Sequence, residues 1–286
     1  NFMRKKYAIV YLMGGFGNQL FQLCFAKELE KRNLFVYIDT SNYLQKNKRK
    51  NIIAENRELT IPINNYGFEE APMYLKIIFK LNNYLRNYSF KNYKFLPIGR
   101  YNDQNFKYQF KKYNQFVGYW QDIELIKSNE DFLKSKLSKN KYIQEAFENI
   151  PVTGSTALHV RRRDYLNMEE ALNEDYYKES LTEAEKQIDN FFFDIYTDDE
   201  DWVKENKIFS NARNLYTSSS SVEDTIKTFA NFLRYENYII SNSTFSLIPA
   251  ILNKNNSNKT FVPNPWFRNT NKTMKYLKGW TLIKNQ

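Results

Sequence analysis

The sequence is poor in the residues that build disulfide scaffolds and metal centres. Its 286 residues include one cysteine, Cys24, and one histidine, His159. A single cysteine excludes a disulfide framework and a cysteine-based zinc site, and it is typical of a reducing compartment. A single histidine excludes histidine-rich metal sites and any mechanism that needs two histidines. The sequence also has no apolar run long enough to span a bilayer, so we expect a cytoplasmic protein.

The composition is otherwise that of a folded globular chain. Hydrophobic residues make up 42% and charged residues 26% of the sequence, which excludes a disordered or fibrous protein. The length fits one large domain or two domains of medium size, and we favour two. Aromatic residues reach 17%, which suits stacking on sugars or bases, although core filling accounts for most of them.

Positive charge is concentrated in the first half of the chain. Residues 1–150 hold 25 Lys and Arg against 14 Asp and Glu, whereas residues 151–286 hold 17 against 18. Such an asymmetry is typical of a half that meets an anionic partner, such as a polyanionic glycan, nucleic acid or the inner face of a membrane. The densest clusters are Lys46–Lys50 and Lys111-Lys112. A basic surface without any partner explains the same counts.

The first half opens with a pattern typical of a doubly wound sheet. Tyr7–Met13 is an apolar run that predicts a buried parallel strand. The glycines at Gly14–Gly17 predict a tight turn, and Gln19–Arg32 has apolar residues at helical spacing. Leu34–Asp39 predicts a second strand. Together these elements form a β-turn-α-β unit.

The second half repeats this alternation of strands and helices. A helix is predicted over Ile123–Lys141 and a new strand over Thr156–Val160, and Pro151–Gly154 between them is the best domain boundary. We therefore predict an α/β fold with two Rossmann-like domains, comprising residues 1–150 and 151–286, that face a cleft.

Glycines surround the turn between the first strand and the first helix, in Gly14-Gly15-Phe16-Gly17-Asn18-Gln19. Glycines let the backbone approach a ligand, and a helix N-terminus offers free N–H groups to a phosphate. A dinucleotide fingerprint is an alternative, because Gly15 and Gly17 precede a helix and Asp39 ends the next strand. Leu20 stands where the third glycine of that fingerprint belongs. A plain tight turn fits the stretch equally well.

Basic residues end the strand of the second half, in His159-Val160-Arg161-Arg162-Arg163-Asp164-Tyr165. Ligands of open α/β sheets bind at the carboxyl ends of strands, and arginine forks suit phosphate oxygens. Alternation sends Arg161 and Arg162 in different directions, so that one can face a ligand while the other packs inward. Asp164 can hold one guanidinium in place. We favour a binding site over a solvated basic turn, because such a turn would not need the only histidine.

Acidic and hydroxyl-bearing residues mark two further strand ends. Tyr196-Thr197-Asp198-Asp199-Glu200-Asp201-Trp202 offers carboxylates either to a divalent metal or to the first turn of the next helix, and the spacing favours the helix start. Ser241-Asn242-Ser243-Thr244-Phe245-Ser246 offers hydroxyls and N–H groups to a second phosphate, and it is equally suited to an ordinary N-cap.

Taken in order along the chain, these four stretches resemble glycosyltransferase family 11, the family of bacterial α-1,2-fucosyltransferases. Smaller similarities are Asp39-Thr40-Ser41, Gly118-Tyr119-Trp120-Gln121 and Val262-Pro263-x-Pro265-Trp266-Phe267. The resemblance covers nearly the whole length and leaves out residues 45–115. One departure is Arg163, since the family commonly has glycine at this position.

The resemblance implies a GT-B fold and metal-independent, inverting transfer from GDP-β-L-fucose, without a cofactor. It assigns the donor to the second half, and to the first half a galactose-containing glycan acceptor from a surface polysaccharide or O-antigen repeat unit. By resemblance, Arg161 contacts the β-phosphate, Arg162 and His159 orient the donor, and Asn18 reaches it from the other half. The further donor-binding residues that the resemblance implies are Gly17, Gln19, Asp164, Asp198, Ser243, Thr244, Phe245 and Ser246.

The sequence does not decide between several candidates for the general base, or between the transferase and two competing functions. Glu169 and Glu170 follow the arginine loop, Asp39 ends a strand of the other half, and proton loss without a dedicated carboxylate is a further alternative. A nucleotide-binding oxidoreductase would explain the glycine turn and Asp39, and a basic RNA-binding module would explain only charge and aromatics. For a transferase we expect the basic half to contact an anionic membrane face peripherally, and no nucleic acid.

Overall fold

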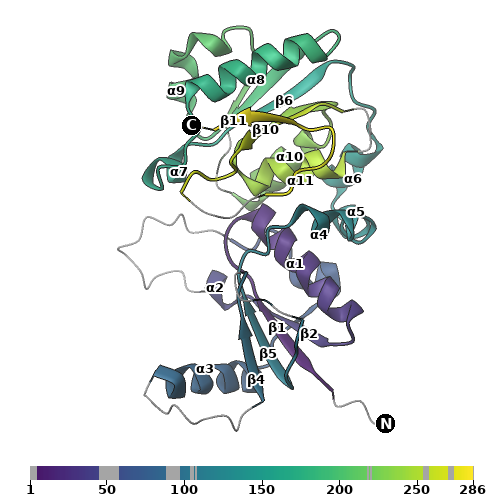
Figure 1. The fold of residues 1–286 in the computed structure, drawn as a ribbon. Coiled ribbons are helices and arrows are strands. Elements are labelled where there is room, and N and C mark those ends of the chain that lie inside the picture. Colours follow the sequence, from purple (N-terminus) through teal and green to yellow (C-terminus); the bar gives the residue numbers. More distant parts are fainter. Residues whose placement is uncertain are drawn as a thin grey trace. The chain divides into compact units, whose positions relative to one another are not determined.

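The chain forms two compact units. The computed structural model describes residues 5–44, 58–87, 97–103, 106, 108–217, 219, 221–253, 258–269 and 274–285. The first unit comprises Asn1–Lys50 and Asn56–Gln121, and the second comprises Asn51–Glu55 and Asp122–Gln286. Each unit is built around its own sheet (Figure 1), and the α/β class predicted from the sequence is confirmed.

The first unit contains a five-stranded sheet in the order β3-β2-β1-β5-β4. All of its strand pairs are parallel. Its elements in chain order are β1 (Tyr7–Tyr11), α1 (Phe16–Lys31), β2 (Phe35–Asp39), α2 (Ser41–Leu44), η1 (Ile63–Tyr66), β3 (Glu69–Glu70), α3 (Met73–Asn87), β4 (Ile98–Tyr101) and β5 (Tyr113–Val117). On one side of β1 the strands follow in sequence order through β2 to β3, and on the other side β5 lies between β1 and the edge strand β4.

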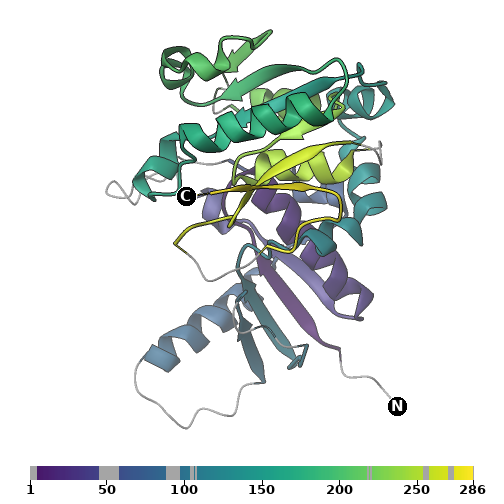
Figure 2. The same cartoon turned by 45° about the horizontal axis from the view of Figure 1, so that its top comes forward.

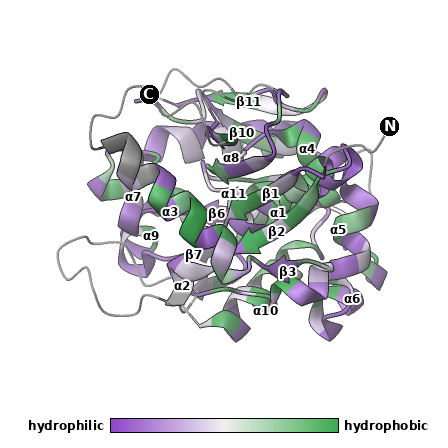
Figure 3. Cartoon of the chain, turned by 90° about the horizontal axis from the view of Figure 1, so that it is seen from below, coloured by the Kyte–Doolittle hydropathy of each residue, from purple (hydrophilic) through white to green (hydrophobic). Residues whose placement is uncertain are grey.

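Helix α1 packs into the core of the first unit because its sequence is rich in apolar residues. Leu20, Phe21 and Leu29 are buried, and the helix contacts β1 and β2 (Figure 3). It begins at Phe16, three residues before the predicted start, with Gly15 as its N-cap. Gly14 has a φ of +80°, which glycine adopts without steric strain. This turn brings the first N–H groups of α1 to the carboxyl end of β1.

The second unit contains a six-stranded sheet in the order β11-β10-β9-β6-β7-β8, again with parallel pairs. Its elements in chain order are α4 (Ile123–Lys127), α5 (Glu130–Leu137), α6 (Lys141–Glu148), β6 (Ser155–Val160), α7 (Arg163–Asn167), α8 (Glu174–Gln187), β7 (Phe192–Thr197), α9 (Glu200–Glu205), η2 (Lys207–Phe209), β8 (Leu215–Thr217), α10 (Val222–Phe232), β9 (Asn237–Ile239), α11 (Thr244–Leu252), β10 (Thr260–Asn264) and β11 (Thr281–Lys284). The six residues of β6 are all buried.

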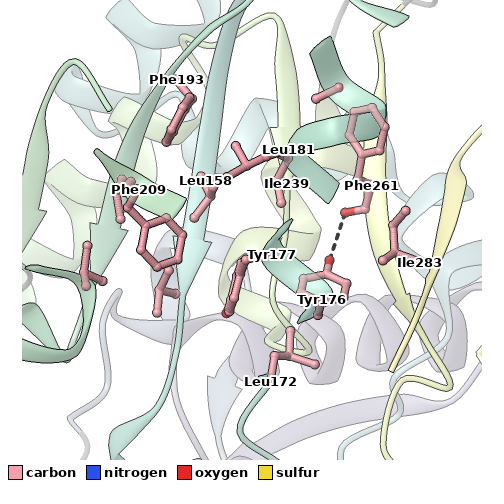
Figure 4. Close-up of a cluster of buried hydrophobic side chains, with 14 of the residues drawn as sticks. Leu158, Leu172, Tyr176, Tyr177, Leu181, Phe193, Phe209, Ile239, Phe261 and Ile283 are labelled. Atoms are coloured by element: carbon pink, nitrogen blue, oxygen red, sulfur yellow. Dashed lines mark hydrogen bonds between the residues drawn. The ribbon is translucent and has the colours of Figure 1, made fainter. Parts of the chain in front are cut away.

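One face of the second sheet is covered by α8, α9 and η2. Helix α8 lies along this face (Figure 2). The buried cluster between these helices and the sheet takes side chains from five strands and from α8, α9 and η2. Those labelled in Figure 4 include Leu158, Phe193, Ile239, Phe261, Ile283, Tyr176, Tyr177, Leu181 and Phe209. The Tyr176 hydroxyl donates to the carbonyl of Ile240 at 2.6 Å, so this buried polar group is satisfied.

The opposite face of the second sheet is covered by helices from two separate parts of the sequence. Helix α10 contacts α6 and α11, and α11 contacts α4. The chain accordingly divides after Gln121, earlier than the boundary expected between residues 150 and 151. Pro151–Gly154 is a loop of the second unit that leads into β6. Proline and glycine mark a turn there, and the helices before it belong to the same core.

The single helix predicted over Ile123–Lys141 is wrong, because this stretch contains the three short helices α4, α5 and the start of α6. Asp122 caps α4, and Asn140 caps α6 by accepting the N–H of Tyr142. Asn129 occupies the N-cap position of α5. Each helix thus begins after an Asp or Asn, whose side chain competes for backbone hydrogen bonds.

Several short elements lie outside the sequence prediction, including β3, β4, β8 and β11. Strand β5 ends at Val117, directly before the similarity at Gly118-Tyr119-Trp120-Gln121. The chain turns there because Trp120 has a φ of +54°. Among the described residues, no helix has both the length and the apolar content needed to cross a membrane. The basic cluster Lys46–Lys50 lies outside the described residues.

Candidate functional site

The order in which strands are added to the second sheet reverses at β6. The chain runs from β6 outward to β7 and β8, and then continues on the other side of β6 with β9, β10 and β11. The loops that follow the adjacent strands β6 and β9 therefore diverge, and ligands of open α/β sheets bind at such positions. Residues 159–164 end β6 and residues 240–246 follow β9. Two of the four sequence motifs thus meet at this point.

Arg161 is the central cation of this site. Its guanidinium contacts the carboxylate of Asp164 at 2.7 Å and that of Asp198 at 3.0 Å. The Arg161 side chain is 15% exposed and that of Asp198 only 4%. Burial raises the pKa of Asp198, and the charge of Arg161 acts against this rise. The two carboxylates hold the guanidinium in one orientation at the carboxyl end of β6.

Arg162 points to the other side of the sheet. Its guanidinium lies 3.9 Å from the centre of the Trp202 ring and donates to the Asp199 carboxylate at 3.1 Å. It also donates to the carbonyl of Leu172 at 3.3 Å. The prediction that alternation separates Arg161 from Arg162 is confirmed. Arg162 packs against α9 and fixes the loop, while Arg163 is exposed and begins α7.

His159 is buried between two hydroxyl groups on the opposite side from Arg162. Its Nδ1 lies 2.8 Å from Oγ of Ser241 and 2.9 Å from Oγ of Ser246. Burial, helped by the charge of Arg161, lowers the pKa of His159 to about 3. The imidazole is therefore neutral near pH 7 and adds no positive charge to the site. It joins the end of β6 to the loop after β9 and to α11.

Helix α11 begins next to His159 with a run of hydroxyl-bearing residues. Ser243 is the N-cap and accepts the N–H of Phe245 at 3.4 Å. Ser246 donates its hydroxyl to the Ser243 carbonyl at 3.3 Å. Ser243, Thr244 and Ser246 are buried, and Phe245 is half-buried. Because a helix start carries N–H groups without helical partners and a positive partial charge, this turn can hold an anion.

The loop after α7 is fixed by a buried glutamate. Glu170 accepts the backbone N–H groups of Arg268 and Asn269, both at 2.8 Å. The guanidinium of Arg268 donates to the carbonyls of Glu169 at 2.5 Å and Ala171 at 3.1 Å. Glu169 is exposed and has a φ of +57°. Of the two adjacent glutamates, Glu170 therefore anchors the loop and Glu169 presents its carboxylate to solvent.

In the first sheet the order of the strands reverses between β1 and β5. The residues of the glycine motif that follow β1 are neutral. Asn18 accepts a hydrogen bond at Oδ1 from Nε2 of Gln121 at 2.8 Å. A Cβ atom on Gly14 would lie 2.6 Å from Nδ2 of Asn18, so glycine is needed for this orientation of the amide. Gly17 is buried in the first turn of α1. The glycine motif thus sets the position of Asn18.

Two buried glutamines of α1 hold the loops around this turn. Gln19 donates to the carbonyl of Glu58 at 3.0 Å and accepts the N–H of Thr60 at 3.1 Å. Gln22 accepts a backbone N–H after β1 at 3.0 Å and donates to a backbone carbonyl after β5 at 2.9 Å. The amide of Gln19, which the resemblance places at the donor, is bonded inside the first unit.

Asp103 holds the loop after β5. Its carboxylate accepts the N–H groups of Tyr119 and Trp120 at 3.1 and 3.2 Å. The Trp120 ring is buried and stacks on Phe25 with a centroid distance of 3.9 Å. Tyr119 is 41% exposed, and a Cβ on Gly14 would lie 3.1 Å from its ring. An aromatic ring and an amide therefore flank the glycine turn.

Other acidic residues of the motifs have structural partners. Asp199 is the N-cap of α9 and accepts a backbone N–H of its first turn at 3.3 Å, as the helix-start interpretation predicts. Asp198 pairs with the guanidinium described above. Asp39 lies 3.2 Å from Nζ of Lys76 and also accepts a backbone N–H of α2 at 3.0 Å. These contacts occupy the carboxylates that a metal or a dinucleotide ribose would use.

Arg268 and Asp103 are positioning residues that the sequence analysis missed. Arg268 contacts a loop 98 residues away in the sequence, and Asp103 lies in the stretch left out by the resemblance. No local spacing indicates such partners. The only sequence signal was indirect, because Arg268 directly follows Trp266-Phe267 of the last small similarity.

A sequence model of glycosyl transferase family 11 matches residues 3–284. An α-1,2-colitosyltransferase of Escherichia coli is 28% identical over an alignment of 164 residues, which covers 54% of this chain and 56% of that protein. The O-antigen biosynthesis glycosyltransferase WbnK of Escherichia coli is 27% identical over an alignment of 302 residues, which covers 94% of this chain and 98% of that protein. The first match thus spans little more than half of the relative's length.

Solved structures with a similar course of the chain include two glycosyltransferases. The NodZ α-1,6-fucosyltransferase soaked with GDP-fucose has a TM-score of 0.46 and 12% sequence identity, with 87% of this chain and 93% of that chain covered. A glycosyl transferase of family 9 from Veillonella parvula has a TM-score of 0.43 and 8% identity, with 98% and 86% covered.

Proposed function

Because the chain belongs to glycosyl transferase family 11, we propose that it transfers L-fucose from GDP-β-L-fucose to the 2-hydroxyl of a terminal galactose, with inversion at the anomeric carbon. The proposed acceptor is a repeat unit of a bacterial surface polysaccharide or O-antigen. The names of the two relatives support an α-1,2 linkage and O-antigen biosynthesis. The family match leaves the oxidoreductase and RNA-binding alternatives without support.

The observation that carries this proposal is the ion-paired Arg161, which follows β6 at the point where the strand order of the second sheet reverses. A nucleotide sugar presents two phosphates, which need cations or N–H donors on more than one side. Arg161 supplies a guanidinium, and the first turn of α11 supplies N–H groups and hydroxyls. We therefore assign donor binding to the second unit. Asp164 and Asp198 hold the guanidinium ready for the β-phosphate.

The chemistry of the leaving group explains why a fixed cation matters. Transfer breaks the bond between the anomeric carbon and the β-phosphate oxygen, and both electrons of that bond stay on GDP. Negative charge therefore grows on the diphosphate in the transition state. A guanidinium that is already oriented stabilises this charge without reorganisation, and the loss of one such group costs about 10²–10³ in rate. In this account no metal ion takes part.

His159 and Arg162 have positioning roles in this account. The neutral imidazole ties α11 to the end of β6 through the hydroxyls of Ser241 and Ser246. Arg162 fixes the arginine loop through its hydrogen bond to Asp199 and its stacking on the Trp202 ring. Both residues thereby keep the phosphate-binding groups at the carboxyl end of β6. Neither exchanges a proton with the substrates.

Glu169 is the carboxylate that we propose as the general base. The acceptor hydroxyl loses its proton as it attacks the anomeric carbon, and a carboxylate within hydrogen-bond reach can take it. Glu170 is buried and occupied by two backbone N–H groups. Asp39 is paired with Lys76. Glu169 is exposed in the loop that follows α7, the helix that begins at Arg163.

The first unit is proposed to bind the acceptor. The residues around its glycine turn are neutral amides and the exposed ring of Tyr119. Amides exchange hydrogen bonds with sugar hydroxyls, and an aromatic ring offers an apolar face to a sugar ring. Gly17 and Asn18 are the proposed substrate contacts of this unit.

A transfer assay tests the proposal. Purified protein is incubated with GDP-fucose and a galactose-terminated disaccharide, and the product linkage is determined by NMR. We expect release of GDP and an α-1,2-fucosylated product. The Glu169→Gln variant should lower kcat by about 10² while its affinity for GDP stays unchanged. No product with GDP-fucose, in a preparation that binds GDP, would contradict the assignment of the sugar.

A second arm of the assay replaces GDP-fucose with GDP-colitose, because one relative is a colitosyltransferase. Colitose lacks the 3-hydroxyl of fucose, so the two donors differ at one position of the sugar ring. Faster transfer of colitose would change the sugar and leave the diphosphate site as described. Faster transfer of fucose supports the proposal as stated.

A further inference from the structure

Helix α3 carries more apolar surface than its packing against the first sheet uses. Leu75 and Phe79 are buried and belong to a cluster with Ile9 of β1 and Ile98 of β4. These residues lie on the face of α3 that covers the sheet. Hydrophobic and hydrophilic residues are nevertheless interleaved along the rest of the helix (Figure 3).

A second set of apolar side chains lies on the solvent side of α3. The side chains are 47–67% exposed, and we call them the α3 stripe; they are Met73, Tyr74, Ile77, Leu81 and Tyr84. Positions 73, 77, 81 and 84 are spaced by three or four residues, so they share one side of the helix. Contiguous exposed apolar residues on a folded domain mark an interaction surface more often than scattered ones do.

The sequence around the stripe is positively charged. Residues 71–102 contain no Asp or Glu and six basic residues, namely Lys76, Lys80, Arg86, Lys91, Lys94 and Arg100. Lys80 is exposed. Lys76 is neutralised by Asp39 and Glu70. At least one cation of the helix therefore borders the stripe without being part of that ion-pair cluster.

The charge identifies the kind of partner. The first unit as a whole holds 20 Lys and Arg against 7 Asp and Glu. A second copy of the chain would bring two strongly basic faces together, which like-charge repulsion opposes. An anionic lipid surface offers negative charge to the cations and an apolar interior to the stripe. Tyrosines suit the boundary between the two, because the ring is apolar and the hydroxyl is polar.

We propose that α3 is a membrane-surface helix that lies in the headgroup region of an anionic bilayer and inserts the α3 stripe among the lipid chains. Peripheral helices of this kind combine an apolar face with bordering cations. The surface is distinct from the Arg161 site and from the glycine turn. The proposal stands independently of the donor and acceptor assignments.

Site-specific labelling tests this proposal directly, because the only cysteine, Cys24, is buried. An Ile77→Cys variant carries an environment-sensitive fluorophore on the stripe, and an Ile150→Cys variant carries it on a residue that is 87% exposed in the second unit. Both are mixed with vesicles of phosphatidylcholine and phosphatidylglycerol at low salt. We expect a blue shift at position 77, no shift at position 150, and loss of the shift at high salt, since screening weakens surface attraction.

Co-sedimentation with the same vesicles measures the contribution of the stripe. The Ile77→Ser/Leu81→Ser variant should bind at least about tenfold more weakly than wild type. The matched variant Ile150→Ser/Val152→Ser removes two exposed apolar residues elsewhere and should bind like wild type. Transfer to a soluble galactoside should be equal in both variants, which separates this result from any failure of the proposed function.

Three results would overturn the proposal. The first is no vesicle binding by wild type at low salt. The second is equal weakening in both double variants, or a blue shift at both labelled positions. The third is a concentration-dependent dimer in sedimentation velocity that Ile77→Ser/Leu81→Ser abolishes without any vesicle binding, because the stripe would then bind a second copy.

Discussion

Both units are built around a parallel sheet, and they differ in the charge that each places where the order of its strands reverses. In the first unit, glycines and amides follow β1, although the unit holds 20 Lys and Arg against 7 Asp and Glu. In the second unit, three arginines end β6, although the unit holds 22 against 25. The net charge of a unit therefore does not indicate the charge at the carboxyl ends of its strands, where we propose that the ligands bind.

The basic residues of the two units suit different kinds of partner, which a count of charges does not show. Arg161 and Arg162 of the second unit are paired with buried or half-buried aspartates, so their charges are fixed in place, and the charge of Arg161 suits a diphosphate. Basic residues of the first unit such as Lys80, Lys111 and Lys112 are exposed, and they suit a broad anionic surface. A neutral glycine turn in the first unit suits an uncharged sugar.

The largest expected effect is the loss of Arg161. We expect Arg161→Ala to lower kcat by about 10²–10³, because the variant loses the guanidinium that we propose at the β-phosphate. The matched variant Arg163→Ala removes an exposed neighbouring charge and should change kcat little. Arg161→Lys should restore only part of the activity, since lysine cannot form a fork. Steady-state kinetics on all three variants checks this prediction.

The fold of the Arg161 variant needs a control, because the change leaves Asp198 buried without its partner. The double variant Arg161→Ala/Asp198→Asn removes both charges and should recover any thermal stability that the single variant loses. Its transfer activity should stay low. Near-normal turnover of either folded variant would contradict the role of Arg161.

A smaller effect is expected from Gly14→Ala in the first unit. A Cβ at this position meets the Asn18 amide and the Tyr119 ring, so we expect transfer to fall by about tenfold, as for other misplaced substrate contacts. Gly279→Ala is the control, because Gly279 also has a positive φ of +92° and nothing lies within 4 Å of its Cβ position. Both variants share the backbone strain. Equal activity of the two would remove the glycine turn from the site.

A modest effect on stability is expected from His159. Its pKa of about 3 in the folded state lies below the ordinary value of about 6.5, so the unfolded chain binds a proton first as the pH falls. The contribution of His159 to the free energy of unfolding is fully present above pH 6.5. It is lost by about 1.4 kcal/mol per pH unit between pH 6.5 and 3. Denaturant unfolding at pH 7.5 and 5.5 should show this loss in wild type and not in His159→Gln.

NMR gives a second check on the same residue. The chain has one histidine, so the imidazole Cε1–H resonance can be assigned to it directly, and the shift of this resonance should stay constant between pH 8 and 5. A titration midpoint near 6.5 would show that His159 is accessible and charged, and it would remove the neutral imidazole from the account.

No effect is expected from a chelator. Asp199 caps α9 and Asp198 pairs with Arg161, so the acidic motif is already occupied. Transfer rates should be equal with and without EDTA. Loss of activity in EDTA, restored by Mn²⁺ or Mg²⁺, would return these carboxylates to a metal site.

The sequence predicted the parts of the fold that depend on local pattern. The β1–α1–β2 opening, the strand β6 and the Asp199 cap all follow from apolar runs, glycines and helix-start acids. The division of the chain could not be found in this way, because α4 and α6 join the second core through contacts with α11 and α10. Sequence proximity says little about which core a helix enters.

Only the part of the candidate site that lies at strand ends could be predicted from the sequence. Arg161, His159 and the Ser243 turn stand at strand ends that the sequence marks clearly. The choice between Glu169 and Glu170 was not available, since it depends on backbone N–H groups nearly a hundred residues away. The α3 stripe was hidden as well, because apolar residues at helical spacing look the same whether they face a core or solvent.

The central claim is that Arg161 contacts the β-phosphate of the donor, and calorimetric titration of GDP and GMP tests it most directly. GMP lacks the β-phosphate and is otherwise the same ligand. The account predicts that Arg161→Ala weakens GDP binding at least about tenfold more than it weakens GMP binding, which is a coupling of about 1.4 kcal/mol or more. Equal weakening for both nucleotides, or none for either, would contradict it.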